Sequence, residues 1–353
     1  MDVNSSNPSE PGASDGAPAP EGLEPGEPAV ALRYPTRASM VDSASDQMVE
    51  IASQFYLQGR TQVQIARDMG LDPSTVSRYL KRAREEGIVR VEIRAPMRVE
   101  ASLGLTLAAR YGLARAVVVP GEEPSLEDVA SVAAEFVAGL LRSGMHLGIS
   151  WGQTLAAVVH ALPPGIVSGL DIAQLAGGVG TTTPGIQCNE LVRYLAELYP
   201  PSQAHYLHAP TIVDSAAIQQ AILSDHSVHE ALTAAARCEL AITGIGTLRD
   251  EDTLVRWGHL STEDRLLLLE RGAVGNINTR FFNEAGRPVV DLEERTIATE
   301  WEDLRRIPMV VAVAWGVAKA RAIRGALGTG CVDVLVTDAP TAKLLLQAAP
   351  VAA

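Results

Sequence analysis

One segment of the chain has the residue types and the spacing of an anion-binding turn. Residues 148–154 read Gly-Ile-Ser-Trp-Gly-Gln-Thr and lie between a short apolar run and a stretch with helical spacing at 155–161. Backbone amides at the start of a helix bind phosphate well, because they have no partner within the helix and lie at the positive end of its dipole. Two hydroxyls and an unobstructed glycine amide add further donors. The residues of this predicted phosphate cradle are Ser150, Gly152, Gln153 and Thr154.

The cradle matches neither of the two common nucleotide motifs. No Gly-Lys-Ser/Thr follows it, as the Walker pattern would require, and the spacing is not GxGxxG, so ATP and dinucleotides are disfavoured. We therefore expect no cofactor. The simpler alternative is an ordinary turn between a strand and a helix, in which Thr154 only caps the helix.

Two more glycine clusters, Gly177–Thr183 and Gly244–Gly246, follow apolar runs. Each alone is typical of an ordinary turn. Because ligands of open α/β sheets gather at the carboxyl ends of strands, several such clusters together favour one shared crevice. The residues expected there are Gly178, Thr181, Gly244 and Gly246.

Lys319 is a candidate partner for an anion. The chain has only three lysines, Lys81, Lys319 and Lys343, among 29 basic residues. Lys319 follows the apolar run 309–314 and should lie in the first turn of the next helix, where a cation opposes the helix dipole unless an anion is present. A phosphate ion pair is the favoured role, a Schiff base with an aldehyde sugar a less favoured one, and a surface lysine without a task the alternative.

The elements that would position these residues are short apolar runs alternating with helical stretches. This order predicts a mostly parallel α/β sheet over the larger part of the chain. The expected strands are 116–119, 147–150, 171–176, 240–245, 309–314 and 332–337.

Three short helices are expected ahead of this domain, at 46–58, 62–69 and about 73–86, with Asp72 capping the third. Ala66 is small where two helices would cross, Gly70 falls at a tight turn and Val76 would be buried. This combination is typical of a helix-turn-helix. A strand at 89–93 is expected after it, either as a wing or as a tether.

The outer face of the third helix is rich in polar and basic residues, as contact with DNA would require. A plain three-helix packing unit with a solvated face is the alternative. The residues expected to reach base edges are Ser74, Thr75, Ser77 and Arg78, and those expected to meet phosphates are Gln62, Lys81 and Arg82.

Composition limits the remaining possibilities. The net charge of −13 argues against a protein that coats nucleic acid or membranes, yet residues 43–95 carry a small positive excess. Residues 1–32 hold six acids and no lysine or arginine among many Pro, Gly, Ala and Ser, so we expect a disordered acidic tail at 1–42, a DNA-binding domain at 43–97 and an effector domain at 98–353. Three separated cysteines, seven scattered histidines and no long apolar run predict a cytoplasmic chain without disulfides, metal site or membrane span.

Taken together, these residues resemble the SorC family of sugar-responsive transcriptional regulators. The matching segments are 148–155, 175–179, 207–210, 244–246, 272–277 with 280–286, Lys319 with 322–323, and 335–338 with 341–342 and 344–345. The resemblance implies an N-terminal helix-turn-helix and a Rossmann-like α/β effector domain similar to glucosamine-6-phosphate deaminase and ribose-5-phosphate isomerase. It also implies dimers or tetramers on operator DNA, control by a phosphorylated sugar or polyol, and effector-site roles for Asn276 and Asp338.

The chain departs from the family pattern at four positions near the expected crevice. The family usually has Arg or Lys where this chain has Gln153, and Asp where it has Asn276 and Asn283. It usually has Gly where this chain has Trp315. These differences leave the identity of the ligand open.

The alternative function is a sugar-phosphate isomerase or deaminase on the same fold, with Asp214, Asp338, Glu190 or His208 as candidate bases. The helix-turn-helix favours the regulator, because such an enzyme has no use for it.

Overall fold

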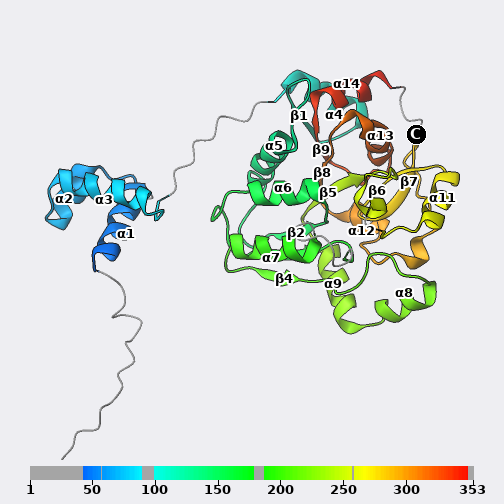
Figure 1. The fold of residues 1–353 in the computed structure, drawn as a ribbon, viewed down its shortest axis with the longest axis horizontal. Coiled ribbons are helices and arrows are strands. Elements are labelled where there is room, and N and C mark those ends of the chain that lie inside the picture. The colour runs from blue at the N-terminus through cyan, green and yellow to red at the C-terminus, as the bar shows by residue number, and fades with distance from the viewer. Residues whose placement is uncertain (1–42, 57, 90–98, 179–186, 257, 349–353) are drawn as a thin grey trace, which may run out of the picture. The chain divides into compact units, whose positions relative to one another are not determined.

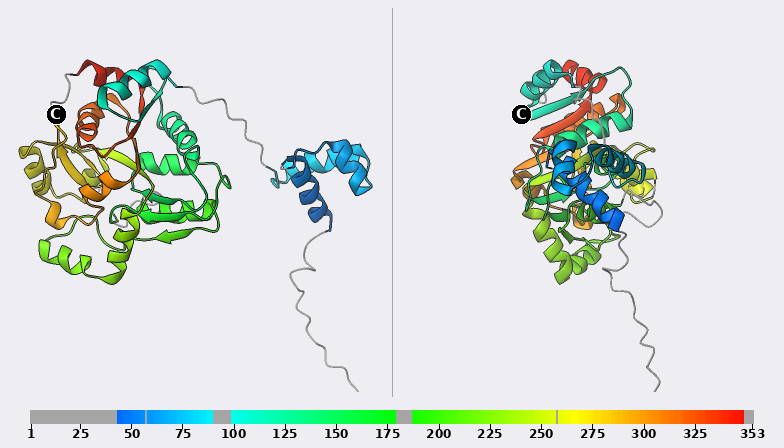
Figure 2. Two further views of the ribbon diagram at one scale, coloured as in Figure 1. Left: turned by 180° about the vertical axis from the view of Figure 1, so that it is seen from behind. Right: turned by 90° about the vertical axis from the view of Figure 1, so that its left-hand side faces the viewer.

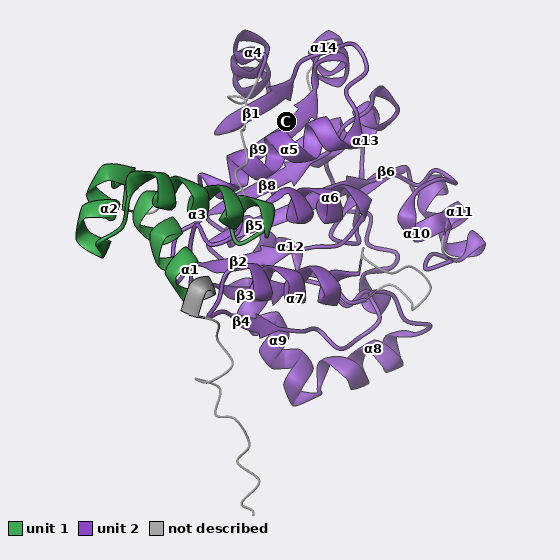
Figure 3. Cartoon of the chain, turned by 60° about the vertical axis from the view of Figure 1, so that its left-hand side comes forward, with its two compact units in different colours: residues 1–94 green, residues 95–353 purple. Residues whose placement is uncertain are grey.

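The computed structural model describes residues 43–56, 58–89, 99–178, 187–256 and 258–348. The chain divides into two compact units, residues 1–94 and 95–353 (Figure 3). The expected tail at 1–42, nearly all of the expected strand at 89–93, the expected domain boundary at 97/98 and Thr181 lie outside the described residues.

The first unit contains three helices: α1 (Ser43–Tyr56), α2 (Gln62–Met69) and α3 (Pro73–Glu85). They enclose a small core of eight buried side chains, which are Met48, Ile51, Ala52, Ile65, Ala66, Val76, Leu80 and Ala83. Gly70 ends α2 in the left-handed conformation at φ 65°, which explains a glycine at the turn between α2 and α3. Ala66, Gly70 and Val76 thus have the places that the helix-turn-helix pattern predicted.

The caps of these helices differ in part from expectation. Thr61 and Gln64 form a capping box at the start of α2. Asp72 is the residue before α3, but its carboxylate makes no capping hydrogen bond, so the prediction that it caps the helix by its side chain was wrong. Pro73 at the first helical position suits a helix start in another way, because its φ is fixed near the helical value and it has no N–H that needs a partner.

The second unit is built on a mixed sheet. Its parallel strands lie in the order β1 (Arg115–Val119), β9 (Val334–Asp338), β8 (Met309–Val313), β5 (Leu240–Gly246), β2 (His146–Ile149), β3 (Asp171–Gln174) and β4 (Gln203–His205). All six expected strands are present. The sheet also contains elements that were not predicted from the sequence. They are the three-residue strand β4 and an antiparallel hairpin, β6 (Ala273–Ile277) and β7 (Arg280–Asn283), which extends from the end of β5.

Helices cover both faces of this sheet (Figures 1 and 2). The helices of the second unit are α4 (Ala101–Tyr111), α5 (Leu126–Ala138), α6 (Gln153–Ala161), α7 (Cys188–Leu198), α8 (Ala216–Leu223), α9 (His226–Ala236), α10 (Thr253–Arg256), α11 (Thr262–Glu270), α12 (Trp301–Arg306), α13 (Ala320–Gly328) and α14 (Ala339–Gln347), with short 3-10 turns η2 (Glu293–Arg295) and η3 (Val317–Lys319). On one face Val117 and Val311 pack with α5, α6 and α7, and on the other Val118 and Ala312 pack with α4, α13 and α14. Successive residues of a strand point to opposite faces, so continuous apolar strands are what a sheet covered on both sides requires.

Among the described residues, no helix is both long and apolar enough to cross a membrane.

Candidate ligand cavity and DNA-contacting surface

A cavity of about 210 Å³ lies at the point where the order of the parallel strands reverses. From β2 the chain builds the sheet outward through β3 and β4, and it then returns to β5, on the other side of β2, and continues through β8. The cavity is lined by the residues at and just after the carboxyl ends of β2 and β5, where open α/β sheets bind their ligands.

The start of α6 forms one wall of this cavity. Gly152 precedes the helix with φ 129°, and no side chain of the described residues caps the first turn. The early amides of α6 are therefore not used by a capping side chain, and Thr154 does not cap the helix as the simpler alternative supposed. An uncapped helix start beside Ser150 and Thr154 has the donors that a phosphate group accepts from.

Most of the predicted effector residues line this one cavity. They are Ser150, Gly152, Gln153, Thr154, Gly244, Gly246, Asn276 and Lys319. Residues from four separate parts of the sequence thus meet at the carboxyl edge of the sheet.

Two predicted residues are placed elsewhere. Gly178 pairs with the backbone of Ala209 and Thr211. Asp338 is 2% exposed and caps α14, and it also accepts a hydrogen bond from the Gly316 amide at 2.5 Å. Its carboxylate therefore links the Gly316 turn to the start of α14, and Asp338 is not among the lining residues of the cavity.

Lys319 ends η3 and precedes α13. Its Nζ donates a hydrogen bond to the carbonyl oxygen of Ile245 at 3.1 Å, which places the ammonium group at the end of β5, on the cavity wall. A neutral carbonyl does not balance its charge, so the ammonium can still meet an anion.

The charged loop that follows β5 was not predicted from the sequence as part of the site. Arg249, Glu251 and Asp252 line the cavity, and Asp252 accepts hydrogen bonds from the amide and the hydroxyl of Thr247. Arg249 pairs with Glu251 at 2.8 Å. With Lys319, the lining has two cations and two carboxylates, so attraction for an anion depends on the α6 dipole and on Lys319 more than on net charge.

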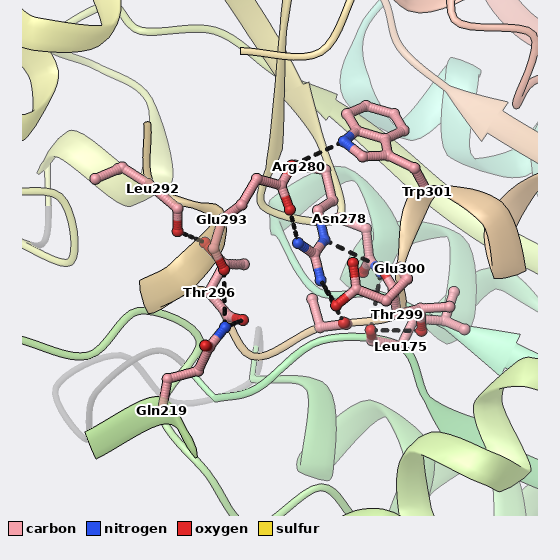
Figure 4. Close-up of polar contacts among 11 residues, drawn as sticks. Leu175, Gln219, Asn278, Arg280, Leu292, Glu293, Thr296, Thr299, Glu300 and Trp301 are labelled. Carbon is pink, nitrogen blue, oxygen red and sulfur yellow. Dashed lines mark hydrogen bonds and ion pairs between the residues drawn. The ribbon is translucent and has the colours of Figure 1, made fainter. Parts of the chain in front are cut away.

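The β6–β7 hairpin forms a further wall, with Asn276, Asn278 and Thr279. Next to it Arg280 is 1% exposed and donates hydrogen bonds to the carbonyl oxygens of Thr299 and Ala298. Figure 4 shows the guanidinium between Glu293 and Glu300, with the Trp301 indole also donating to Glu293. This buried network anchors the hairpin.

The candidate bases of the alternative enzyme do not gather at the cavity. Asp214 and His208 are exposed, and neither they nor Glu190 and Asp338 line it. In the described part of the chain, no group of three or more His, Cys, Asp or Glu side chains has the geometry of a metal site.

In the first unit, α3 presents all of the predicted DNA contacts except Gln62, which begins α2. Ser74, Ser77, Arg78, Lys81 and Arg82 are exposed, and Gln62 and Thr75 are half-buried. Lys81 pairs with Glu85 at 3.7 Å and Arg82 with Glu86 at 2.5 Å, one turn along the same helix. Exposed ion pairs of this kind contribute little to stability, so DNA phosphates can replace the carboxylates as partners of these two cations.

We expect Arg78→Ala to weaken operator binding by about 1–3 kcal/mol and to relax base preference, because Arg78 lies near the start of the exposed face of α3. Lys81→Ala should weaken binding to all sequences alike and lower the salt slope by about one unit. Filter-binding titrations at several salt concentrations measure both. Arg287→Ala, the loss of an exposed arginine in the other unit, is the control, and wild-type affinity in an Arg78→Ala, Lys81→Ala double variant would contradict the assignment.

Two family models match this chain. Residues 96–347 match a family model described as "Putative sugar-binding domain", and residues 56–96 match one described as "Winged helix-turn helix". The deoxyribonucleoside regulator of Bacillus subtilis (strain 168) is 31% identical over 304 residues, 85% of this chain and 96% of that protein. The sorbitol operon regulator of Klebsiella pneumoniae is 30% identical over 307 residues, 85% of this chain and 97% of that protein.

Solved structures of transcriptional regulators are similar to this chain as well. The full-length sorbitol operon regulator SorC from Klebsiella pneumoniae matches 86% of this chain and 100% of its own, with a TM-score of 0.65 and 29% identity. A DeoR family transcriptional regulator from Listeria monocytogenes matches 69% of this chain and 98% of its own, with a TM-score of 0.64 and 28% identity.

The fold and the two sites thus define a transcriptional regulator in which a helix-turn-helix precedes an α/β sugar-binding domain. The chain belongs to the SorC-type family of sugar-binding transcriptional regulators.

Proposed function

We propose that the ligand of the cavity is a phosphorylated sugar or polyol and that its binding controls the attachment of the first unit to operator DNA of a carbohydrate or polyol catabolic operon. The observation that carries this proposal is the uncapped start of α6, which faces the same cavity as Lys319. An uncapped helix start and an ammonium group suit a phosphate, whereas the backbone and amide groups elsewhere on the wall suit hydroxyls. The match to a sugar-binding domain model and the sorbitol operon regulator among the relatives support a sugar or polyol as the ligand.

We infer that the cavity binds its ligand without converting it. The carboxylates on its wall are engaged, Glu251 with Arg249 and Asp252 with Thr247, and no histidine is found among its described lining residues. A general base needs a free group within hydrogen-bond reach of a substrate proton. This placement favours a sensor over an isomerase or deaminase.

We also propose that the chain self-associates as a dimer or tetramer. One helix-turn-helix contacts a short site, and specific affinity usually comes from two modules on half-sites related by symmetry. Light scattering of the full chain measures this, and a monomer at micromolar concentration on its own and on operator DNA would refute it.

The direct test is a mobility-shift assay with the DNA upstream of the gene, repeated with a panel of sugar and polyol phosphates. The expected result is a specific complex whose affinity or mobility changes with one or a few phosphorylated members and not with their unphosphorylated parents. If no phosphorylated ligand changes the affinity or the mobility of the complex, the proposed effector class is refuted.

Thr154→Val tests the α6 wall more finely. The substitution keeps the side-chain volume and removes a hydroxyl on the cavity, so we expect the effector concentration for half-maximal response to rise on the order of 5- to 10-fold, the worth of one hydrogen bond of about 1 kcal/mol or slightly more. Effector-free DNA binding should be unchanged. Thr106→Val on α4, away from the cavity, is the matched control, and a wild-type response in Thr154→Val would remove this hydroxyl from the site.

A further inference from the structure

The tip of the β6–β7 hairpin carries an amide side chain whose oxygen has no hydrogen-bond partner within the described structure. Asn278 lines the cavity and is 3% exposed, and its Oδ1 has no hydrogen-bond partner among the described residues. We propose that Asn278 accepts a hydrogen bond from a hydroxyl group of the effector, so that the effector is a monophosphate with a hydroxyl, and not a second phosphate, at this wall. The inference rests on the proposed function and specifies the ligand within it.

The orientation of the Asn278 amide is determined by its neighbour. Its Nδ2 donates to the carbonyl oxygen of Leu175 at 2.8 Å, an oxygen that also accepts hydrogen bonds from the amide and the hydroxyl of Thr299 (Figure 4). A carbonyl oxygen cannot donate, so the atom that faces it must be the nitrogen. The remaining atom, Oδ1, is therefore an acceptor.

A buried acceptor of this kind favours a ligand that places a hydrogen-bond donor next to it. A sugar hydroxyl donates a proton and satisfies Oδ1, whereas an ionised phosphate or carboxylate presents only acceptor oxygens and leaves Oδ1 unpaired. Sites built to hydrogen-bond a hydroxyl discriminate strongly against analogues that lack it, because the buried partner then remains unsatisfied.

The turn that presents Asn278 is held in an unfavourable backbone conformation. Asn278 and Thr279 have φ of 53° and 63°, and positive φ is a true outlier for a β-branched residue such as threonine. Two contacts hold the turn. The Thr279 hydroxyl lies 2.8 Å from that of buried Thr211, and Arg280 is bound to the backbone at Ala298 and Thr299. Asn278 is thus placed in advance of ligand binding, which is the use that strained residues at binding sites commonly have.

Asn276 supports the same interpretation from two residues earlier on the hairpin. It is 6% exposed, lines the cavity and lies close against Gly246, where an added Cβ would be 2.5 Å from its Nδ2. The buried Nδ2 makes no hydrogen bond to a described residue. A hydroxyl is the group that both donates and accepts, so one hydroxyl or two adjacent ones can satisfy the free acceptor of Asn278 and a free donor of Asn276.

The test uses the full chain and measures Kd by calorimetry for four named probe pairs. The pairs are ribose 5-phosphate with 2-deoxyribose 5-phosphate, glucose 6-phosphate with 2-deoxyglucose 6-phosphate, fructose 6-phosphate with fructose 1,6-bisphosphate, and sorbitol 6-phosphate with sorbitol. We expect at least one monophosphate to bind. For the monophosphate that binds most tightly, analogues that each lack one hydroxyl identify the hydroxyl that meets Asn278. Loss of that hydroxyl should weaken binding on the order of 10- to 100-fold, and a second phosphate should weaken binding at least as much.

The variant Asn278→Gly removes Oδ1 and suits the positive φ, so the chain should fold. In this variant the parent and the deoxy analogue should bind equally. Asn189→Gly is the matched control, because it removes the same side chain at an exposed position of α7 outside the cavity lining and should keep the discrimination.

The outcomes separate the two levels of the proposal. If no phosphorylated probe binds, the proposed function fails and the inference fails with it. If a monophosphate binds but all its deoxy analogues bind as tightly, or the bisphosphate binds equally well, the role of Asn278 is refuted while the proposed function stands. Retained discrimination in Asn278→Gly would likewise overturn it.

Discussion

Lys319→Met is expected to abolish the response to effector at concentrations that saturate the wild-type protein, and to leave operator binding unchanged. The ammonium group reaches the cavity wall, where Ile245 supplies only a neutral carbonyl as partner. Loss of a charge-assisted hydrogen bond to phosphate should weaken effector binding by about 1.5–3 kcal/mol, on the order of 10- to 100-fold. The substitution should not destabilise the fold, because a cation before α13 opposes the helix dipole and its removal ends this unfavourable interaction.

Mobility shift and calorimetry on the same preparation measure both halves of this expectation. Lys343→Met makes the same change at an exposed position of α14 and should respond as wild type. Borohydride reduction with ribose 5-phosphate distinguishes the two roles considered for Lys319: a stable adduct on this residue would support an imine, and binding without an adduct would support the ion pair. A fully responsive Lys319→Met protein would reject both.

Arg280→Met is expected to lower the free energy of unfolding of the second unit by about 3–5 kcal/mol. Burial lowers the pKa of Arg280, yet its guanidinium meets Glu293 and Glu300 and two backbone carbonyl oxygens. When the cation is removed, the Glu293 carboxylate and the two carbonyl oxygens lose this donor. The Glu293 side chain is only 21% exposed. An unpaired buried charge is costly, whereas an exposed one is not.

Urea unfolding followed by tryptophan fluorescence measures this effect, because all four tryptophans lie in residues 95–353 and report on the second unit alone. Glu300→Gln is the matched control. Its side chain is 59% exposed, so its loss should cost less than about 1 kcal/mol. Equal unfolding midpoints for the two variants would show that Arg280 does not anchor the hairpin.

The first unit shows what local sequence can determine. Ala66, Gly70 and Val76 have roles that depend on neighbours within about ten residues, and a left-handed turn at Gly70 follows from local backbone preference. The bounds of α2 agree with the prediction for the same reason. The failed cap at Asp72 shows the limit, since a favourable residue type at the right position does not fix the direction of its side chain.

The cavity shows an intermediate case. Glycine-rich strand ends predicted that residues 150–154 and 244–246 meet, because carboxyl ends of parallel strands share one edge of a sheet. Gly178 was expected at the same edge, but its backbone groups pair with Ala209 and Thr211. Asp338, whose effector role only the family resemblance implied, uses its carboxylate to cap α14 and to accept from the Gly316 amide. Whether a strand-end residue faces the ligand or the protein depends on which loops fold over it.

Residue types and spacing alone thus determined the helix-turn-helix, the parallel α/β sheet and the glycine-rich edge at which its cavity lies, because each follows from hydrophobic period and from backbone preference over a few residues. Only the tertiary structure revealed the β6–β7 hairpin beside β5, the buried cation that anchors it, and the Asn278 acceptor on the cavity wall that has no partner among the described residues. Those features arise from contacts between residues as much as 103 positions apart, such as Asn278 with Leu175, and no local pattern encodes them.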